Sequence, residues 1–375
     1  MARRLGTIGI LAVGAFLGGL VGSIAIVRVA PASAQTPLPP KTIDDSPAKV
    51  ELRGVPDFEA VVKKVMPAVV AVDAIKTIGK TKPAEESGSG VLMKFEGFKG
   101  TYAVTNNHVV EGSKVSDITV VLNDGRILIP ELVWTDPASD IAILRVTGDN
   151  LPSAELGDSD RAKPGSWVLA FGSPLGFNQT VTHGIISARE RGQVTLNNTI
   201  RIKEFLQSDA AINPGSSGGP LSDSEGRIIG INTAIASGGA SNTTFAGISF
   251  SIPINLVKRL GKELLEKGNV SRGYLGLQMS NALDARTALK LGLPKLRGAM
   301  VESVYDKGPA QKAGLQSGDI ILKIDGLDVR DENQFINVVG SLPIGESIRL
   351  TVWRNKQAKP FELIVGDWPT RRERN

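Results

Sequence analysis

Short apolar runs separated by turn residues dominate the centre of the chain. Residues 118–122 form a β-rich run, residues 123–125 (Asn-Asp-Gly) tolerate positive φ, and residues 126–129 resume the strand pattern, which predicts a hairpin. Three further runs have the same character: residues 141–146, 167–171 and 228–231. Many short strands without long helices between them predict a mainly β region, built as a barrel or a sandwich.

Apolar side chains recur at helical spacing in short segments at the two ends of this region. One set predicts a short helix that ends before Pro67, and a second set predicts a helix over residues 253–267. The first set is Phe58, Val61, Val62 and Val65, and the second is Leu256, Leu260, Leu264 and Leu265. The second helix would connect the central region to a separate C-terminal domain.

The N-terminal residues 1–34 have the pattern of an export segment. Arg3 and Arg4 precede an uncharged, mostly apolar stretch over residues 5–27, which is long enough to cross a bilayer. Residues 32–34 (Ala-Ser-Ala) form a small-x-small pattern that a signal peptidase can cut before Gln35. A cleaved signal peptide and a retained membrane anchor both fit, and both place the rest of the chain outside the cytoplasm.

Residues 35–56 have the composition of a linker. Five prolines among polar residues favour extended backbone with little apolar surface to bury: Pro37, Pro39, Pro40, Pro47 and Pro56. An irregular arm packed on the next domain is the alternative. The last residues, 371–375, are charged and are expected to form a solvated tail.

Composition excludes several kinds of site. The 375 residues include no Cys and 2 His, so there is no disulfide, thiolate nucleophile, Cys-based zinc site or three-His metal site. The net charge is +5, but no dense Lys/Arg stripe with interleaved aromatics accompanies it. We therefore expect no nucleic-acid partner.

The segment 210–221 is a candidate nucleophile loop. Three glycines surround Ser216 and Ser217, and glycine permits the backbone angles of a tight loop that aims two amides at one point while exposing a hydroxyl. A plain Gly/Ser turn between strands is the alternative.

A serine nucleophile needs a base, and His108 and His183 are the two candidates. His108 follows the apolar residues 102–104 and can project from a strand end, whereas His183 sits in an alternating run typical of a strand surface. Asp140 leads directly into the apolar run 141–146 and can hold the imidazole as a buried carboxylate, whereas Asp136 precedes a proline and favours a turn. A strand-entry cap is the alternative role for Asp140.

The order His, Asp, Ser is that of the chymotrypsin-type barrels. The segments TNNHVV, SDIAIL and INPGSSGGPL resemble the three active-site segments of the HtrA (Deg) family of serine proteases, and the layout is similar across residues 57–370. The resemblance implies a chymotrypsin-like double β-barrel over residues 57–268 and a PDZ domain over residues 269–370. It also implies homotrimers or multiples of trimers in the cell envelope, no ATP or metal cofactor, and misfolded or regulatory proteins as substrates.

The family's G-x-S-G-G pattern falls on residues 215–219. It makes Ser217 the nucleophile and the amides of Gly215 and Ser217 the oxyanion donors, each typically worth about a hundred- to a thousandfold in rate. Ser216 stands where the family usually has Asn, so this assignment depends on spacing to the glycines.

The resemblance also implies a specificity pocket. Ala211 lies where trypsin-like enzymes have the pocket floor, with a wall from Ile231, Asn232 and Thr233, so we expect small or medium apolar side chains before the cut. Residues 187–208 and 234–246 resemble the family's regulatory loops, with Arg191 as the candidate sensor; plain surface loops are the alternative.

In the C-terminal domain, residues 272–277 resemble the carboxylate-binding loop of PDZ domains. Tyr274, Leu275, Gly276 and Leu277 would grip a peptide C-terminus and offer a strand edge. A short helix with Phe335, Ile336 and Val339 would complete an apolar groove. A small β-rich domain without a ligand is the alternative.

Two other functions compete with the protease. A noncatalytic PDZ-dependent chaperone or scaffold would keep the groove and lack hydrolysis, but no triad member is missing from the sequence. An esterase is disfavoured by the chain order and by the absence of a strand-turn-helix context around the serine.

Overall fold

The computed structural model describes residues 56–76, 84–173, 180–191, 204–235, 247–280 and 283–368. The predicted signal or anchor segment, the linker before Pro56 and the charged tail lie outside these ranges, as do residues 192–203 and 236–246 of the predicted regulatory loops. Among helices in the described ranges, none combines the length and apolar character that a membrane span requires.

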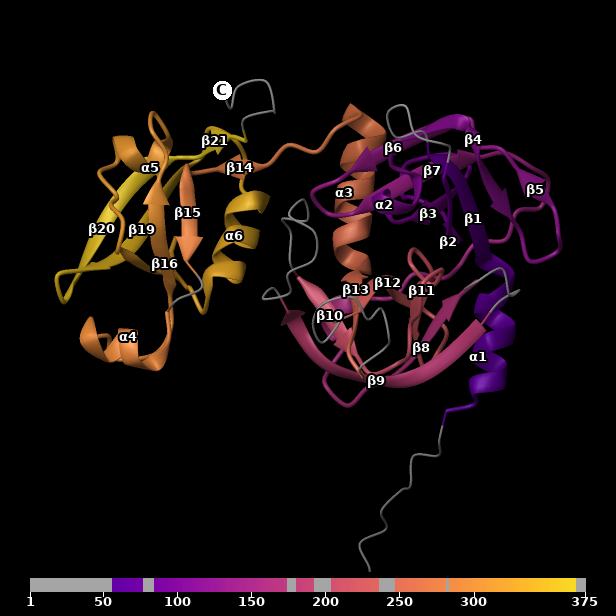
Figure 1. The fold of residues 1–375 in the computed structure, drawn as a ribbon, viewed down its shortest axis with the longest axis horizontal. Coiled ribbons are helices and arrows are strands. Elements are labelled where there is room, and N and C mark those ends of the chain that lie inside the picture. The colour runs from indigo at the N-terminus through magenta and orange to yellow at the C-terminus, as the bar shows by residue number, and fades with distance from the viewer. Residues whose placement is uncertain are drawn as a thin grey trace, which may run out of the picture. The chain divides into compact units, whose positions relative to one another are not determined.

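The first β-sheet is antiparallel and has seven strands in the order β5-β4-β1-β2-β3-β7-β6 (Figure 1). Its strands are β1 (Val69–Lys76), β2 (Ala84–Met93), β3 (Thr101–Thr105), β4 (Ser113–Val121), β5 (Ile127–Leu128), β6 (Leu132–Asp136) and β7 (Ile141–Val146). The predicted hairpin is confirmed, since β4 pairs with β5 through Val120 and Leu128, and Gly125 in the turn has φ 85°.

The second sheet closes into a barrel in the order β10-β13-β12-β11-β8-β9. Its strands are β8 (Trp167–Gly172), β9 (Thr180–Arg191), β10 (Phe205–Ser208), β11 (Pro220–Asp223), β12 (Ile228–Ile235) and β13 (Ser249–Pro253). One hydrophobic core runs from the first sheet into this barrel, with Val91 and Ile143 on one side and Phe171 and Phe205 on the other. The barrel also has a core cluster of its own around Leu221.

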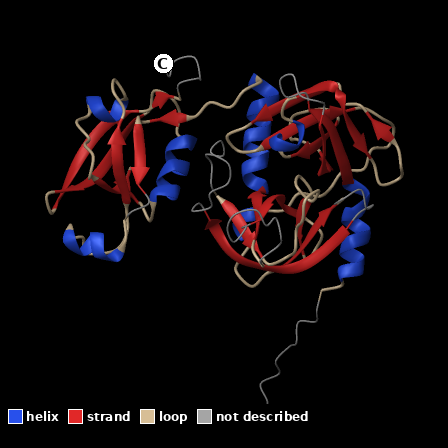
Figure 2. Cartoon of the chain, viewed as in Figure 1, coloured by secondary structure: helices blue, strands red, loops and turns tan. Residues whose placement is uncertain are grey.

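Two predicted helices flank these sheets (Figure 2). Helix α1 (Phe58–Val65) begins at Asp57, whose carboxylate accepts from the Ala60 amide at 3.0 Å, and is followed by a 3-10 turn, η1 (Met66–Ala68). Helix α3 (Ile254–Lys267) ends at Gly268, where φ is 78°. It contacts β6 of the first sheet and also β12 and β13 of the barrel, so the helix packs against both sheets. A short helix, α2 (Asn107–Val110), and a turn, η2 (Ser159–Arg161), complete this part.

The C-terminal sheet has the order β15-β16-β17-β19-β20, with β18 paired to β17 and a separate β14-β21 ribbon. Its strands are β14 (Gly273–Tyr274), β15 (Leu277–Ser280), β16 (Ala299–Val304), β17 (Ile320–Ile324), β18 (Leu327–Asp328), β19 (Ser347–Arg354), β20 (Gln357–Ile364) and β21 (Gly366–Asp367). Its helices are α4 (Ala285–Lys290), α5 (Pro309–Lys312) and α6 (Glu332–Ser341), and the sheet has its own hydrophobic core. The mainly β prediction is confirmed.

Candidate active site

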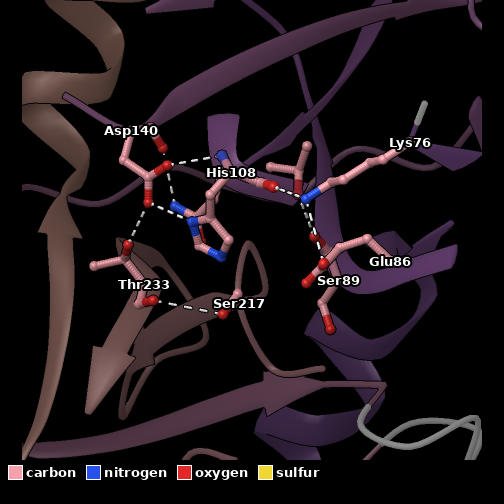
Figure 3. Close-up of polar contacts among 9 residues, drawn as sticks. Lys76, Glu86, Ser89, His108, Asp140, Ser217 and Thr233 are labelled. Atoms are coloured by element: carbon pink, nitrogen blue, oxygen red, sulfur yellow. Dashed lines mark hydrogen bonds and ion pairs between the residues drawn. The ribbon is translucent and has the colours of Figure 1, made fainter. Parts of the chain in front are cut away.

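His108 of helix α2 and Asp140, which directly precedes β7, form a hydrogen-bonded pair. The His108 Nδ1 atom lies 2.7 Å from Asp140 Oδ2, and the His108 amide donates to Oδ1 at 2.9 Å (Figure 3). Both carboxylate oxygens therefore hold the same residue, one through its ring and one through its backbone. The Asp140 side chain is 3% exposed and that of His108 is 34% exposed. The carboxylate is thus screened from solvent while the imidazole stays accessible.

His108 differs in one respect from the expected placement. Strand β3 ends at Thr105, and His108 is the second residue of the four-residue helix α2 rather than the tip of the strand. This turn brings the backbone amide of His108, as well as its ring, to Asp140.

The backbone of Asp140 is held in an unusual conformation. Its φ is 58°, a left-handed angle that aspartate tolerates better than most residues. The Asn106 side-chain amide and the Asn107 amide both donate to the Asp140 carbonyl, at 3.0 and 3.1 Å. Asp136, the rejected candidate, is buried and accepts from the Ser139 amide in the turn before β7. This placement fits the predicted role of Asp136 in a turn.

Ser217 reaches this pair from the barrel, and Thr233 lies between them. The Ser217 hydroxyl donates to the Thr233 carbonyl at 3.4 Å, while the Thr233 hydroxyl donates to Asp140 Oδ2 at 2.7 Å (Figure 3). Among the described contacts, the Ser217 hydroxyl thus bonds to Thr233 and not to the His108 ring. The sequence-predicted histidine, aspartate and serine come together at the boundary between the two sheets.

The loop that carries Ser217 depends on its glycines. Gly215 has φ 93° and Gly218 has φ 87°, and a Cβ on Gly218 would lie 2.1 Å from the Ser89 carbonyl oxygen. The Ser216 amide donates to the Asn213 carbonyl, which tightens the turn. Within the described ranges, the amides of Gly215 and Ser217 have no hydrogen-bond acceptor.

The predicted specificity residues have different surroundings. Ala211 is half-buried and its carbonyl accepts from the Thr182 hydroxyl. Ile231 is buried in the core, and the Asn232 side chain donates to backbone carbonyls inside the barrel. Thr233 directs its hydroxyl to Asp140. The side chains of Ile231 and Asn232 are therefore engaged inside the barrel, and the Thr233 hydroxyl is engaged at Asp140.

Two further candidates are on strand β9. Arg191 is the last residue of β9, and its side chain lies outside the described part of the chain. His183 lies on the exposed face of β9 beside Phe58 and Trp167, with ring centroids 5.3 and 6.0 Å away. This is the strand-surface position that the alternating pattern around His183 predicts.

The C-terminal sheet carries an apolar groove at the predicted loop. Tyr274, Leu275, Gly276 and Leu277 all line it, together with Phe335, Ile336 and Val339 of α6. Gly276 has φ 75°, which explains the need for glycine at the bend between β14 and β15. Trp368 also lines the groove and packs edge-on against Tyr274, with centroids 5.1 Å apart.

Three contributions to the site were not predicted from the sequence. Lys76 donates to the His108 carbonyl at 2.5 Å, Ser89 bonds to the Ser217 loop, and the Thr233 hydroxyl bonds to Asp140. The serine-glycine alternation over residues 87–90 is a sequence feature that could have indicated close backbone contact there. Each contact joins residues more than 30 positions apart, which no local pattern encodes.

Two known families match this chain, one in its central part and one in its C-terminal part. A family described as trypsin-like peptidase domain matches residues 88–231, and one described as PDZ domain matches residues 273–365.

Curated relatives carry one consistent description. A probable periplasmic serine endoprotease DegP-like from Halomonas elongata is 36% identical over 354 residues, which is 84% of this chain and 71% of the relative. One from Pseudomonas putida strain F1 is 42% identical over 292 residues, 77% of this chain and 58% of the relative. The matched region thus spans 71% of the first relative and 58% of the second.

Solved structures agree in fold. The HtrA-type protease AlgW with tripeptide has a TM-score of 0.72 at 40% identity and covers 85% of this chain and 99% of that one. The serine endoprotease from Yersinia pestis has a TM-score of 0.60 at 31% identity and covers 84% of this chain and 100% of that one.

Proposed function

Since the chain belongs to the HtrA family of trypsin-like serine proteases, we propose that it is an ATP-independent endoprotease of the periplasm or cell envelope that cleaves misfolded or regulatory proteins. The observation that supports the proposal is the pair of hydrogen bonds between Asp140 and His108, near the Ser217 hydroxyl. The Asp140 carboxylate lies 2.7 Å from Nδ1 of His108 and accepts from the His108 amide at 2.9 Å. Residues 57–268 would form the protease domain and residues 269–370 the PDZ domain.

In this proposal His108 is the general base. Asp140 accepts from Nδ1–H, which leaves the other ring nitrogen, Nε2, free to take a proton. The Ser217 hydroxyl turns from the Thr233 carbonyl to Nε2, loses its proton to the ring and attacks the scissile carbonyl. The resulting oxyanion is held by the Gly215 and Ser217 amides, and His108 then donates its proton to the leaving amine.

The groove supports regulation by C-terminal peptides. An extended peptide would add to the edge of β15, with its carboxylate at residues 274–277 and its side chains against α6. Measuring cleavage by the full chain with and without added C-terminal peptides, and by a chain that ends before residue 269, tests whether the groove activates or only tethers.

Assembly, attachment and specificity complete the proposal. We expect a homotrimer or a multiple of trimers, either anchored through residues 5–27 or released after signal cleavage.

We also expect cleavage after small or medium apolar residues, because Ala211 supplies no carboxylate for a basic side chain. A peptide library in which basic residues dominate before the cut would contradict this specificity.

The experiment that tests the function uses unfolded casein. The full chain should produce fragments, lose activity on treatment with a serine-directed fluorophosphonate, and be inactive as His108→Ala. His183→Ala is the matched control, because that ring lies on the barrel surface, and it should retain activity. Intact casein with the parent protein would favour the noncatalytic chaperone or scaffold.

A further inference from the structure

Ser89 lies beneath the loop that carries Ser217, and all of its polar groups are engaged. This residue of β2 is fully buried. Its hydroxyl donates to the Gly215 carbonyl at 2.6 Å and accepts from the Ser173 amide at 2.7 Å. Its own amide donates to the Ser217 carbonyl at 2.7 Å, and its carbonyl accepts from the Thr105 hydroxyl at 2.7 Å.

These contacts fall on both residues that supply the proposed oxyanion amides. Ser89 holds the carbonyl of Gly215 through its side chain and the carbonyl of Ser217 through its backbone. The peptide between Gly215 and Ser216 is held from both ends, because the Ser216 amide donates to the Asn213 carbonyl at 2.8 Å. The plane of that peptide is therefore fixed by hydrogen bonds.

Glycine alone cannot fix this plane. Gly215 has φ 93°, and glycine reaches many other angles at low cost because it has no Cβ. The contact that resists rotation at its carbonyl is the Ser89 hydroxyl. The Ser173 amide is a donor and cannot accept from this hydroxyl, so among the described contacts the hydroxyl hydrogen goes to the Gly215 carbonyl.

We infer that Ser89 is a positioning residue for the oxyanion site: its hydroxyl holds the Gly215–Ser216 peptide and so restricts the two neighbouring peptides, which carry the Gly215 and Ser217 amides. The inference rests on the proposed protease function. Ser89 touches neither the substrate nor the reacting atoms in this scheme. It acts through the backbone of the loop, from a strand of the other sheet.

The test is Ser89→Ala in the full chain, which removes the hydroxyl and leaves the backbone contacts. Ser222→Ala is the matched control: Ser222 is equally buried, on β11, and its hydroxyl bonds to the Asp223 carbonyl, away from the loop. Peptide cleavage gives kcat and KM. Inhibition by a peptide aldehyde, which adds to the serine and forms an oxyanion, reports the oxyanion site directly.

We expect Ser89→Ala to lower kcat about 10- to 100-fold with KM within about threefold of the parent, since misplaced donors reduce transition-state stabilisation selectively. The aldehyde should bind more weakly by the same factor. Ser89→Thr, which restores a hydroxyl, should recover part of kcat. Rates are expressed per site labelled by the fluorophosphonate, so that partial unfolding does not imitate the effect.

A kcat for Ser89→Ala within about threefold of Ser222→Ala would overturn the inference. So would a loss that appears in KM while aldehyde affinity is unchanged. An inactive parent protein would instead contradict the protease function itself, so the two failures are distinguishable.

Discussion

The Thr233 hydroxyl lies 2.7 Å from the same Asp140 oxygen that holds the His108 ring. Thr233 stands on β12 of the barrel and Asp140 precedes β7 of the first sheet, 93 residues away. The buried carboxylate therefore has donors from both sheets, and the Thr233 carbonyl accepts from Ser217 as well. Thr233 therefore links the Asp140 carboxylate to Ser217, the proposed nucleophile.

Replacing Thr233 with valine should reduce catalysis without changing the shape of the side chain. A hydrogen bond to a charged group contributes about 1.5–3 kcal/mol, so we expect kcat to fall roughly tenfold or more. The contact between Ser217 and the Thr233 carbonyl is to backbone and should persist. Thr233→Ser keeps the hydroxyl and should retain most activity; equal activities of the two variants would refute the role of the hydroxyl.

Lys76 contacts His108 on the side away from Asp140 (Figure 3). Its ammonium donates to the His108 carbonyl at 2.5 Å and pairs with Glu86 at 3.3 Å, and its side chain is 13% exposed. Lys76→Met should lower kcat/KM about tenfold, because helix α2 loses a charge-assisted contact at His108, the proposed base. Steady-state peptide cleavage measures this effect on the proposed base.

Lys63→Met provides the matched control for Lys76. Lys63 pairs with Glu59 on the surface of α1, where its side chain is 75% exposed. This substitution should leave activity within about twofold of the parent, since exposed pairs contribute little. A Lys76→Met variant as active as Lys63→Met would show that the contact to His108 is dispensable.

In the C-terminal domain, Arg354 neutralises the buried carboxylate of Asp319. Both Asp319 oxygens accept from Arg354 at 2.6 Å, the Asp319 side chain is 2% exposed, and the partnership raises the pKa of Arg354. Arg354→Met leaves the carboxylate unpaired and should destabilise this domain by about 3 kcal/mol in chemical denaturation.

The control for Arg354 is Arg349→Met. Arg349 pairs with Glu362, and both side chains are more than half exposed. The free energy of unfolding should therefore fall by less than about 1 kcal/mol. If Arg354→Met lowers the free energy of unfolding no more than Arg349→Met does, the assigned role of the buried pair is contradicted.

The sequence predicted what depends on local pattern. The hairpin around Gly125, the helices at Phe58 and residues 253–267, and the choice of Asp140 over Asp136 follow from periodicity, turn residues and the apolar run that Asp140 precedes. The mutual approach of His108, Asp140 and Ser217 was expected from chain order and matches their places in the structure.

The remaining features depend on contacts between distant segments. The hydroxyls of Ser89 and Thr233 and the ammonium of Lys76 acquire their roles only when the two sheets meet, so the local sequence does not reveal their partners. The left-handed φ of Asp140 likewise follows from Asn106 and Asn107 holding its carbonyl. The wall of the specificity pocket was assigned by resemblance, and it stays a prediction.

The central claim is that Ser217, rather than its neighbour Ser216, is the nucleophile. Ser216 is buried, and its hydroxyl accepts from the Asn213 amide at 3.4 Å, whereas Ser217 faces the site of His108 and Asp140. The most direct measurement is mass spectrometry of the fluorophosphonate adduct, paired with casein cleavage by Ser217→Ala and Ser216→Ala. The account predicts an adduct on Ser217, no cleavage by Ser217→Ala and substantial cleavage by Ser216→Ala; an adduct on Ser216, or cleavage by Ser217→Ala, would contradict it.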